Sequence, residues 1–143
     1  MTVRFILPLL LFFAVSNAQC IKCEALSEAL KAPEQVKSLA VNGNLSGEEF
    51  DEFPKDVFKL RNIEELYITD YGFYEIPRQI GNLKKIKSLS LAGNSLEVLP
   101  DEIFTLTNLT ELILSDNLFS DEYIEYIKQT VKEKLPKTRL MID

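Results

Sequence analysis

IEELYITDYGFYEIPRQIGNLKK (residues 63–85) and IKSLSLAGNSLEVLPDEIFTLTN (residues 86–108) are two consecutive copies of one pattern. A third, shorter copy, LTELILSDNLFSDEY, begins at Leu109, so that the openings Ile63, Ile86 and Leu109 are 23 positions apart. Each copy begins with apolar residues spaced as L-x-x-L-x-L, and the first two continue with P-x-x-I-x-x-L. A fixed period of this length is typical of stacked units that bury one continuous core.

A diverged copy stands in front of these three. VKSLAVNGN places Val36, Leu39 and Val41 on the same pattern, but its opening lies 27 positions before Ile63. The extra residues fall in LSGEEFDEF (45–53). Insertions in stacked repeats map to loops on one face.

The pattern predicts a strand and a returning helical turn in every copy. The alternation around the second and third leucines favours a short strand, and successive units supply the crossovers that parallel strands need. A proline then starts a segment whose apolar residues are three apart, which indicates a short helix or 3₁₀ turn. The asparagine after each strand is expected to bond loop backbone groups that would otherwise be buried unpaired. These residues are Asn44, Asn94 and Asn117, whereas Tyr71 takes the place in the copy 63–85.

These motifs resemble those of the leucine-rich-repeat proteins. The lead-in EALKAPEQVKSLAVNGN (28–44) and the ending IKQTVKEKLPKTRLMI (127–142) are similar to flanking segments of small exported repeat proteins of spirochaetes such as Leptospira. The resemblance implies an α/β fold: a short right-handed solenoid with a parallel β-sheet on its concave face and helical caps at both ends. It also implies surface display or adhesion as a role, without a named ligand.

The first 18 residues are predicted to be a cleaved signal peptide. Arg4 provides a basic start, residues 5–15 are apolar, and Ser16 and Ala18 are the small residues of a cleavage site. A membrane helix is the alternative, but eleven apolar residues are too few to span a bilayer. The mature chain, 19–143, is then exported, as a secreted, periplasmic or surface-associated protein, and has no predicted transmembrane segment. A lipid anchor on Cys20 is a second alternative, disfavoured by the large Gln19 before it.

Two cysteines, Cys20 and Cys23, form the only C-x-x-C, and the chain has no histidine. Redox chemistry would need a thioredoxin-like βαβ pattern around the motif, and a zinc site would need further ligands. A local disulfide that ties down the N-terminal end is the expected role in an oxidising compartment. No cofactor or metal is predicted.

Charge and length argue for one acidic domain. The formal net charge of −6 becomes −7 when the leader with Arg4 is removed. This sign disfavours nucleic acid and anionic membranes as partners. Residues 19–143 are expected to form a single repeat domain with a helix starting after Ser120. Its predicted parts are an N-terminal cap (19–35), four repeats (36–62, 63–85, 86–108 and 109–120) and a C-terminal cap (121–143).

A partner is expected on the concave face, where residues between the core leucines point outward. Tyr67 and Ile113 are large apolar groups on a face that is otherwise small and polar, and exposed aromatics are frequent interface anchors. The alternative is that scattered surface apolar residues have no role. The predicted partner-binding residues are Tyr67, Ile113, Glu65, Glu111, Thr69 and Ser90.

The insertion 45–53 brings four carboxylates around Phe50, which is expected to be a free side chain. A solvated acidic loop is favoured over a calcium site, because the spacing lacks the EF-hand pattern. Nearby, Phe73 is expected in the core, with Tyr71 and Tyr74 exposed.

Three functions from different classes follow. An exported module that binds a protein partner agrees best with the repeat and the leader. A structural component of the cell envelope without a discrete ligand is the alternative. An enzyme is disfavoured, because the sequence shows no nucleophile–base pair, G-x-S-x-G motif or phosphate-binding glycine loop.

Overall fold

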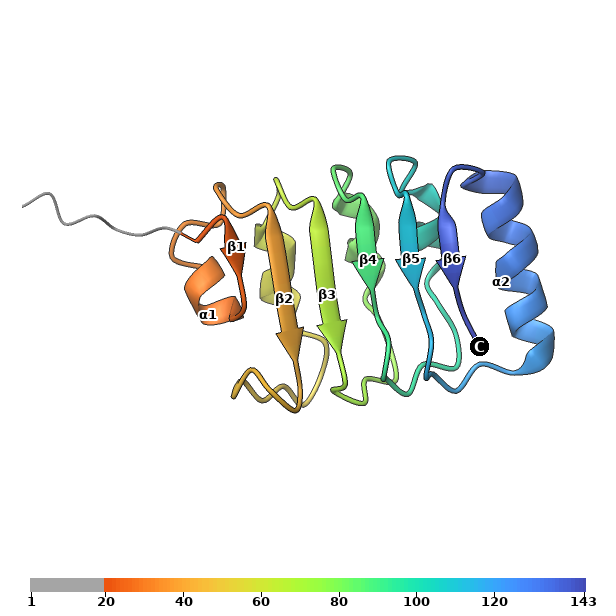
Figure 1. Ribbon diagram of the computed structural model, residues 1–143, viewed down its shortest axis with the longest axis horizontal. Helices are drawn as coiled ribbons and strands as arrows, with labels where there is room; N and C mark the ends of the chain where they lie inside the picture. The colour runs from red at the N-terminus through yellow and green to blue at the C-terminus, as the bar shows by residue number, and fades with distance from the viewer. Residues whose placement is uncertain (1–19) are drawn as a thin grey trace, which may run out of the picture.

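Residues 20–143 are described by a computed structural model, and the predicted signal peptide 1–18 lies outside them. Within the described residues, the strands form one parallel sheet in chain order, and the helical turns lie behind it (Figure 1). The strands are β1 (Lys22–Cys23), β2 (Ser38–Asn42), β3 (Glu65–Thr69), β4 (Ser88–Ser90), β5 (Glu111–Ile113) and β6 (Arg139–Met141). The helical segments are α1 (Leu26–Ala29), η1 (Lys55–Lys59), η2 (Arg78–Asn82), η3 (Asp101–Thr105) and α2 (Asp121–Lys134).

The leucine of each strand sets the register of the sheet. Leu66 pairs with Leu39 on one side and with Leu89 on the other, and the series continues through Leu112 to Leu140. Leu39, Leu66, Leu89 and Leu112 are each 0% exposed. Because a slip of one residue would turn every leucine to the outer face, this burial specifies the pairing strongly. The predicted parallel sheet is therefore confirmed.

Each returning segment is a 3₁₀ turn that begins after a proline. Pro54, Pro77 and Pro100 precede η1, η2 and η3, and their fixed φ lies between −62° and −71°. The apolar residues Val57, Ile80 and Ile103 then point into the core and are 0% exposed. The strands and the 3₁₀ turns thus enclose a core that continues from one repeat to the next.

Two of the three predicted asparagines complete the loops. The Nδ2 atom of Asn94 donates to Leu91 O at 2.9 Å and to Ile68 O of the preceding repeat at 3.0 Å. Its Oδ1 atom accepts from Phe73 N, also in the preceding repeat. Asn117 repeats this arrangement one unit later, bonding Leu91 O and Leu96 N. Each asparagine therefore completes the loop of the repeat before it.

The prediction for Asn44 is wrong. Its side chain is exposed, and the loop bond is made by its backbone, which donates to Asn42 Oδ1. The difference arises because no copy of the same geometry precedes the diverged copy, so there is no preceding loop for Asn44 to complete.

Tyr71, at the asparagine position, is half-buried rather than exposed. Its ring stacks on Phe73 and lies against Phe50, with centroids 5.2 Å away in both pairs. The Tyr71 hydroxyl lies 2.8 Å from Ser46 Oγ in the insertion. Phe50 is consequently packed against the core instead of being free. Phe73 is buried and Tyr74 is exposed, as expected.

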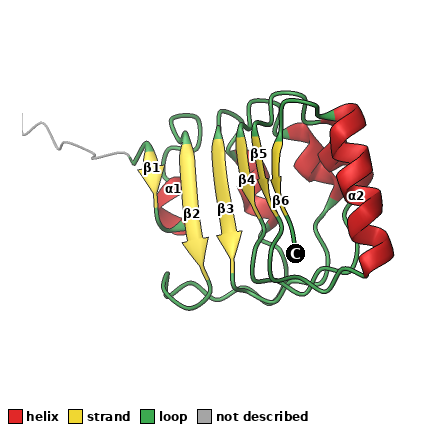
Figure 2. Cartoon of the chain, turned by 45° about the vertical axis from the view of Figure 1, so that its right-hand side comes forward, coloured by secondary structure: helices red, strands yellow, loops and turns green. Residues whose placement is uncertain are grey.

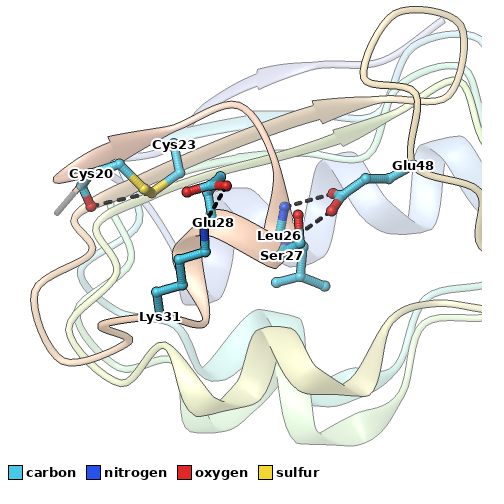
Figure 3. The surroundings of a disulfide bond; sticks show 7 residues. All are labelled: Cys20, Cys23, Leu26, Ser27, Glu28, Lys31 and Glu48. Carbon is cyan, nitrogen blue, oxygen red and sulfur yellow. Dashed lines mark hydrogen bonds and ion pairs between the residues drawn. A yellow bond between two sulfur atoms is a disulfide. The ribbon is translucent and has the colours of Figure 1, made fainter. Parts of the chain in front are cut away.

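The N-terminal end combines a strand and a single helical turn. β1 extends the sheet beyond β2, and a disulfide joins Cys20 to Cys23 across a Cα–Cα distance of 5.3 Å (Figure 3). α1 covers only four residues, Leu26–Ala29, so the helix of the expected N-terminal cap is a single turn. Leu26 and Ala29 face the core. Pro33 and the short length of this segment leave room for only one turn.

Glu48 of the insertion completes the start of α1. Its carboxylate accepts hydrogen bonds from Leu26 N at 2.6 Å and from Ser27 N at 2.9 Å (Figure 3). Partial burial raises the pKa of Glu48, but the hydrogen bonds from Ser27 and Leu26 outweigh it and lower the pKa overall. The residue before the helix, Ala25, has no side chain that can do this. The acidic insertion therefore fastens the N-terminal end to the first repeat.

Replacing Glu48 with glutamine is expected to lower the free energy of unfolding by about 1 kcal/mol at neutral pH, the usual size of a lost helix cap. A lowered folded pKa contributes stability above the unfolded pKa, near 4.5, and this contribution disappears as the pH falls through the folded value. Urea unfolding at neutral pH and well below pH 4.5 measures the difference. Glu49→Gln, an exposed neighbour, is the control. A constant gap between Glu48→Gln and wild type at both pH values would contradict this role.

The C-terminal end is closed by α2 and β6. The Ser120 side chain accepts a hydrogen bond from Tyr123 N, and Asp121 and Glu122 occupy the first turn, where negative charge is favourable. Ile127 and Val131 face the core, whereas Ile124 is only half-buried. β6 then pairs with β5 as the last strand (Figure 2). Among residues 20–143, no helix has the length and apolar character needed to cross a bilayer.

Candidate functional site

The concave face is made of the outward residues of the strands, and the register aligns them in rows. Tyr67 of β3 pairs with Ala40 and Ser90, and Ser90 pairs with Ile113. A second row contains Glu65 and Glu111. Ser88 lies between these two glutamates, and Ser38 lies on the other side of Glu65. The structure adds Met141 to the first row and Lys22 and Arg139 to the second, through β1 and β6.

Tyr67 and Ile113 flank a small residue in the centre of the sheet. Ser90 lies between them in the row and is only 3% exposed, although it is on the outer face. Strands lie about 4.8 Å apart, so large side chains on both neighbours cover the serine. Ser90 therefore offers almost no surface to a partner, and Tyr67 and Ile113 lie on either side of it in the row.

A row of ions borders the concave face at the start of the strands. Glu64 accepts hydrogen bonds from Lys87 at 2.6 Å and from Lys37 at 3.0 Å, so that three neighbouring repeats are linked. The lysines, Lys87 foremost, lower the pKa of Glu64 to about 2. Glu64 is thus occupied, whereas Glu65 and Glu111 have no ion pair within residues 20–143. In the second row, Glu65 and Glu111 are therefore the acidic groups free to meet a partner.

Thr69 lies at the other end of β3, and its hydroxyl accepts a hydrogen bond from the neighbouring strand β2. Asn42 Nδ2 donates to Thr69 Oγ1 at 3.0 Å and also to the Asp70 carboxylate. The hydroxyl of Thr69 retains its own proton for donation. The predicted site therefore divides into an apolar centre, acidic positions beside it and a polar edge.

Arg139 and Met141 were not predicted as site residues. The sequence did not predict the register of β6, because this strand lies outside the repeat pattern. Alternation in that strand, with Leu140 inward, is the signal that would have assigned both side chains to the concave face.

A shallow groove of about 740 Å³ lies away from this face. Phe53 and Phe73 line its base, and Tyr74, which is 76% exposed, stands at its side with Glu75 and Arg78. No group of three or more side chains among residues 20–143 has the arrangement of a metal site.

The repeated strand, the loop bonds of Asn94 and Asn117 and the continuous core define the fold of the chain as a leucine-rich-repeat solenoid. The family model described as leucine rich repeat matches residues 61–119. Solenoids of this class are in general modules for protein–protein interaction. No curated protein sequence matches the chain significantly.

Solved structures of the same class superpose on the chain. A leucine-rich-repeat protein of Leptospira interrogans has 30% sequence identity and a TM-score of 0.64, over 83% of this chain and 28% of that one. An internalin (inlF) of Listeria monocytogenes has 24% identity and a TM-score of 0.60, over 85% and 32%. The ectodomain of the receptor kinase SOBIR1 of Arabidopsis thaliana has 20% identity and a TM-score of 0.56, over 84% and 60%. The last two show the fold alone, and this chain spans less than two thirds of each of the three.

Proposed function

We propose that the chain is an exported module that binds a protein partner on the concave face of its sheet. The observation that carries the proposal is the placement of two large apolar residues, Tyr67 and Ile113, on either side of Ser90, which is only 3% exposed. A partner that covers these two side chains would gain apolar burial at the centre of the face and would meet Glu65 and Glu111 beside them. Export is supported by the leader sequence of residues 1–18 and by the cysteine pair Cys20 and Cys23.

The test uses the folded mature chain, residues 19–143, immobilised and exposed separately to host extracellular proteins and to bacterial envelope extract. The double variant Tyr67→Ala, Ile113→Ala is expected to bind the captured protein at least about tenfold more weakly, because central apolar anchors contribute most of the affinity. Affinity is measured on the purified partner, and circular dichroism melting checks that the variant folds.

The matched control removes apolar surface elsewhere. Val98 and Leu118 are each 58% exposed and lie outside the strands, so Val98→Ala, Leu118→Ala should leave the affinity unchanged. An equal loss of affinity in both double variants would contradict binding on the concave face. So would capture of the partner that neither double variant changes. Concave substitutions that are silent in every extract would favour the structural envelope role.

A further inference from the structure

The C-terminal edge of the sheet is an open strand beside an apolar groove. β6 is the last strand and pairs only with β5. Arg139 N donates to Thr110 O, and Met141 O accepts from Leu114 N, so the backbone groups of Arg139 and Met141 face β5. Because successive residues of a strand alternate in direction, the N–H and C=O of Leu140 point to the open side. The N–H of Ile142 follows the same alternation.

The groove lies where an additional strand would place its inward side chains. It has a volume of about 610 Å³ and is formed by α2 and the segment around β6. Val131 and Leu135 of the helical side are buried, while Leu140 and Ile142 are half-buried and extend the core to the surface. Figure 1 shows α2 beyond β6 at this end of the molecule. Backbone groups and apolar surface are thus available together.

The charge of this end is opposite to that of the chain. Residues 128–139 contain five bases and one acid, whereas the whole chain has 16 bases and 22 acids. Lys128 and Lys132 line the groove, and Lys128 is paired with Glu125 at 2.7 Å. Lys132, Lys137 and Arg139 make no ion pair within residues 20–143. Their charge is therefore available to a ligand.

We propose that the β6 edge is a second binding site, which accepts an extended acidic segment of another protein as an added parallel or antiparallel strand. Apolar side chains of that segment enter the groove beside Leu140 and Ile142. Carboxylates at the alternating positions meet Arg139 on the concave side and Lys132 at the rim. Backbone bonds to an exposed edge supply affinity in this mode of recognition, and the alternating side chains supply specificity.

A second copy of the chain fits this edge poorly. Pairing of β6 with its own counterpart would gather Lys132, Lys137 and Arg139 of both copies at one interface, although Arg139 would lie opposite Met141 when the two Leu140 residues pair. Pairing with β1 of another copy in the register of this sheet would place Lys22 beside Arg139, because both belong to the same row. Like charges directly opposite on neighbouring strands are destabilising.

The test uses a capped peptide of about six residues, the usual length of a strand, in which valine and glutamate alternate. It is added to the ¹⁵N-labelled mature chain, and amide hydrogen exchange is followed residue by residue. Exchange at Leu140 and Ile142 is expected to slow about tenfold when the peptide is at about ten times its Kd. Arg139, whose N–H already bonds to β5, should change little. A peptide with lysine in place of glutamate should have no effect.

Two variants separate the charge from the backbone contribution. Lys132→Glu, Arg139→Glu is expected to weaken peptide binding at least tenfold, and Ile142→Pro should do so by removing an edge N–H. The control, Lys22→Glu, Arg61→Glu, changes the net charge equally at the other end of the stack and should bind as wild type. Thermal melting establishes that each variant folds.

Three results would overturn the proposal. One is absence of binding at about 1 mM peptide, the weak limit of useful affinity. Another is protection that maps to β3 to β5 instead of Leu140. The third is a dimer of the chain in sedimentation that Lys132→Glu, Arg139→Glu abolishes or strengthens, which would assign the edge to a second copy. Tyr67→Ala, Ile113→Ala should leave peptide binding intact, so the outcome is independent of the concave-face proposal.

Discussion

Replacing Asn94 with alanine is expected to lower the free energy of unfolding by about 2–5 kcal/mol. Asn94 is 6% exposed and joins Ile68 O, Leu91 O and Phe73 N. Alanine would leave Ile68 O and Phe73 N without their side-chain partner, whereas Leu91 O keeps its bond from Asn117. Each unsatisfied buried group costs about 1–3 kcal/mol. Urea unfolding of the mature chain, followed by far-UV circular dichroism, measures the change.

Asn44 provides the matched control for this experiment. It occupies the same repeat position, but its side chain is exposed and makes no hydrogen bond within the described residues. Asn44→Ala should therefore change the free energy of unfolding by no more than about 0.5 kcal/mol. Similar losses at Asn44 and Asn94 would show that the substitution acts through the unfolded chain and not through the loop bonds of Asn94.

Replacing Leu89 with alanine is expected to cost a similar amount, about 2–5 kcal/mol, for a different reason. Leu89 is 0% exposed and lies in register between Leu66 and Leu112 at the middle of the stack. The substitution removes apolar burial and leaves a cavity that the two neighbouring strands border. Since each repeat contacts only its neighbours, the loss weakens both interfaces of the central unit.

Calorimetry distinguishes the possible consequences of Leu89→Ala. A single transition at a lower temperature would show that the short stack unfolds as one unit, which is the expected outcome. Val98→Ala changes a side chain that is 58% exposed, so its free energy of unfolding should stay within about 0.5 kcal/mol of wild type. A melting curve for Leu89→Ala that coincides with wild type would exclude the placement of this leucine in the core.

The repeat pattern was sufficient to predict the strands of the repeats and their register, but it did not predict the structure of the two ends of the stack. Leu39, Leu66, Leu89 and Leu112 could be aligned by counting, because each unit meets the same neighbour in the same way. Cap residues have no such constraint. The bond from Glu48 to the start of α1 joins positions 22 apart in sequence and depends on how the insertion folds back. Nothing in the local pattern of GEEFDEF distinguishes Glu48 from Glu49.

Departures from the pattern had local causes that appear only in three dimensions. Tyr71 replaces asparagine because the loop before it belongs to the diverged copy, where Ser46 and Phe50 offer a hydroxyl and a ring instead of the usual backbone groups. The alternation of residues along each strand predicted which side chains lie on the concave face. It did not predict how exposed each of those side chains is. Ser90 is buried because its neighbours are large, which alternation alone does not express.

Asn94 and Asn117 each make bonds that run from one repeat back to the repeat before it. This direction affects how a chain of this kind can gain or lose repeats. Asn94 bonds the loop that ends at Phe73, and Asn117 bonds the loop that ends at Leu96, so each of these two units is completed by its successor. A duplicated copy of residues 86–108, placed next to the original, would complete the loop before it and would itself be completed by the original. Tandem duplication of a central unit therefore preserves the bonds between each asparagine and the loop before it. Deletion of the last unit, in contrast, removes the bonds that its predecessor requires. Only the terminal segments, which follow no pattern, set where the array stops.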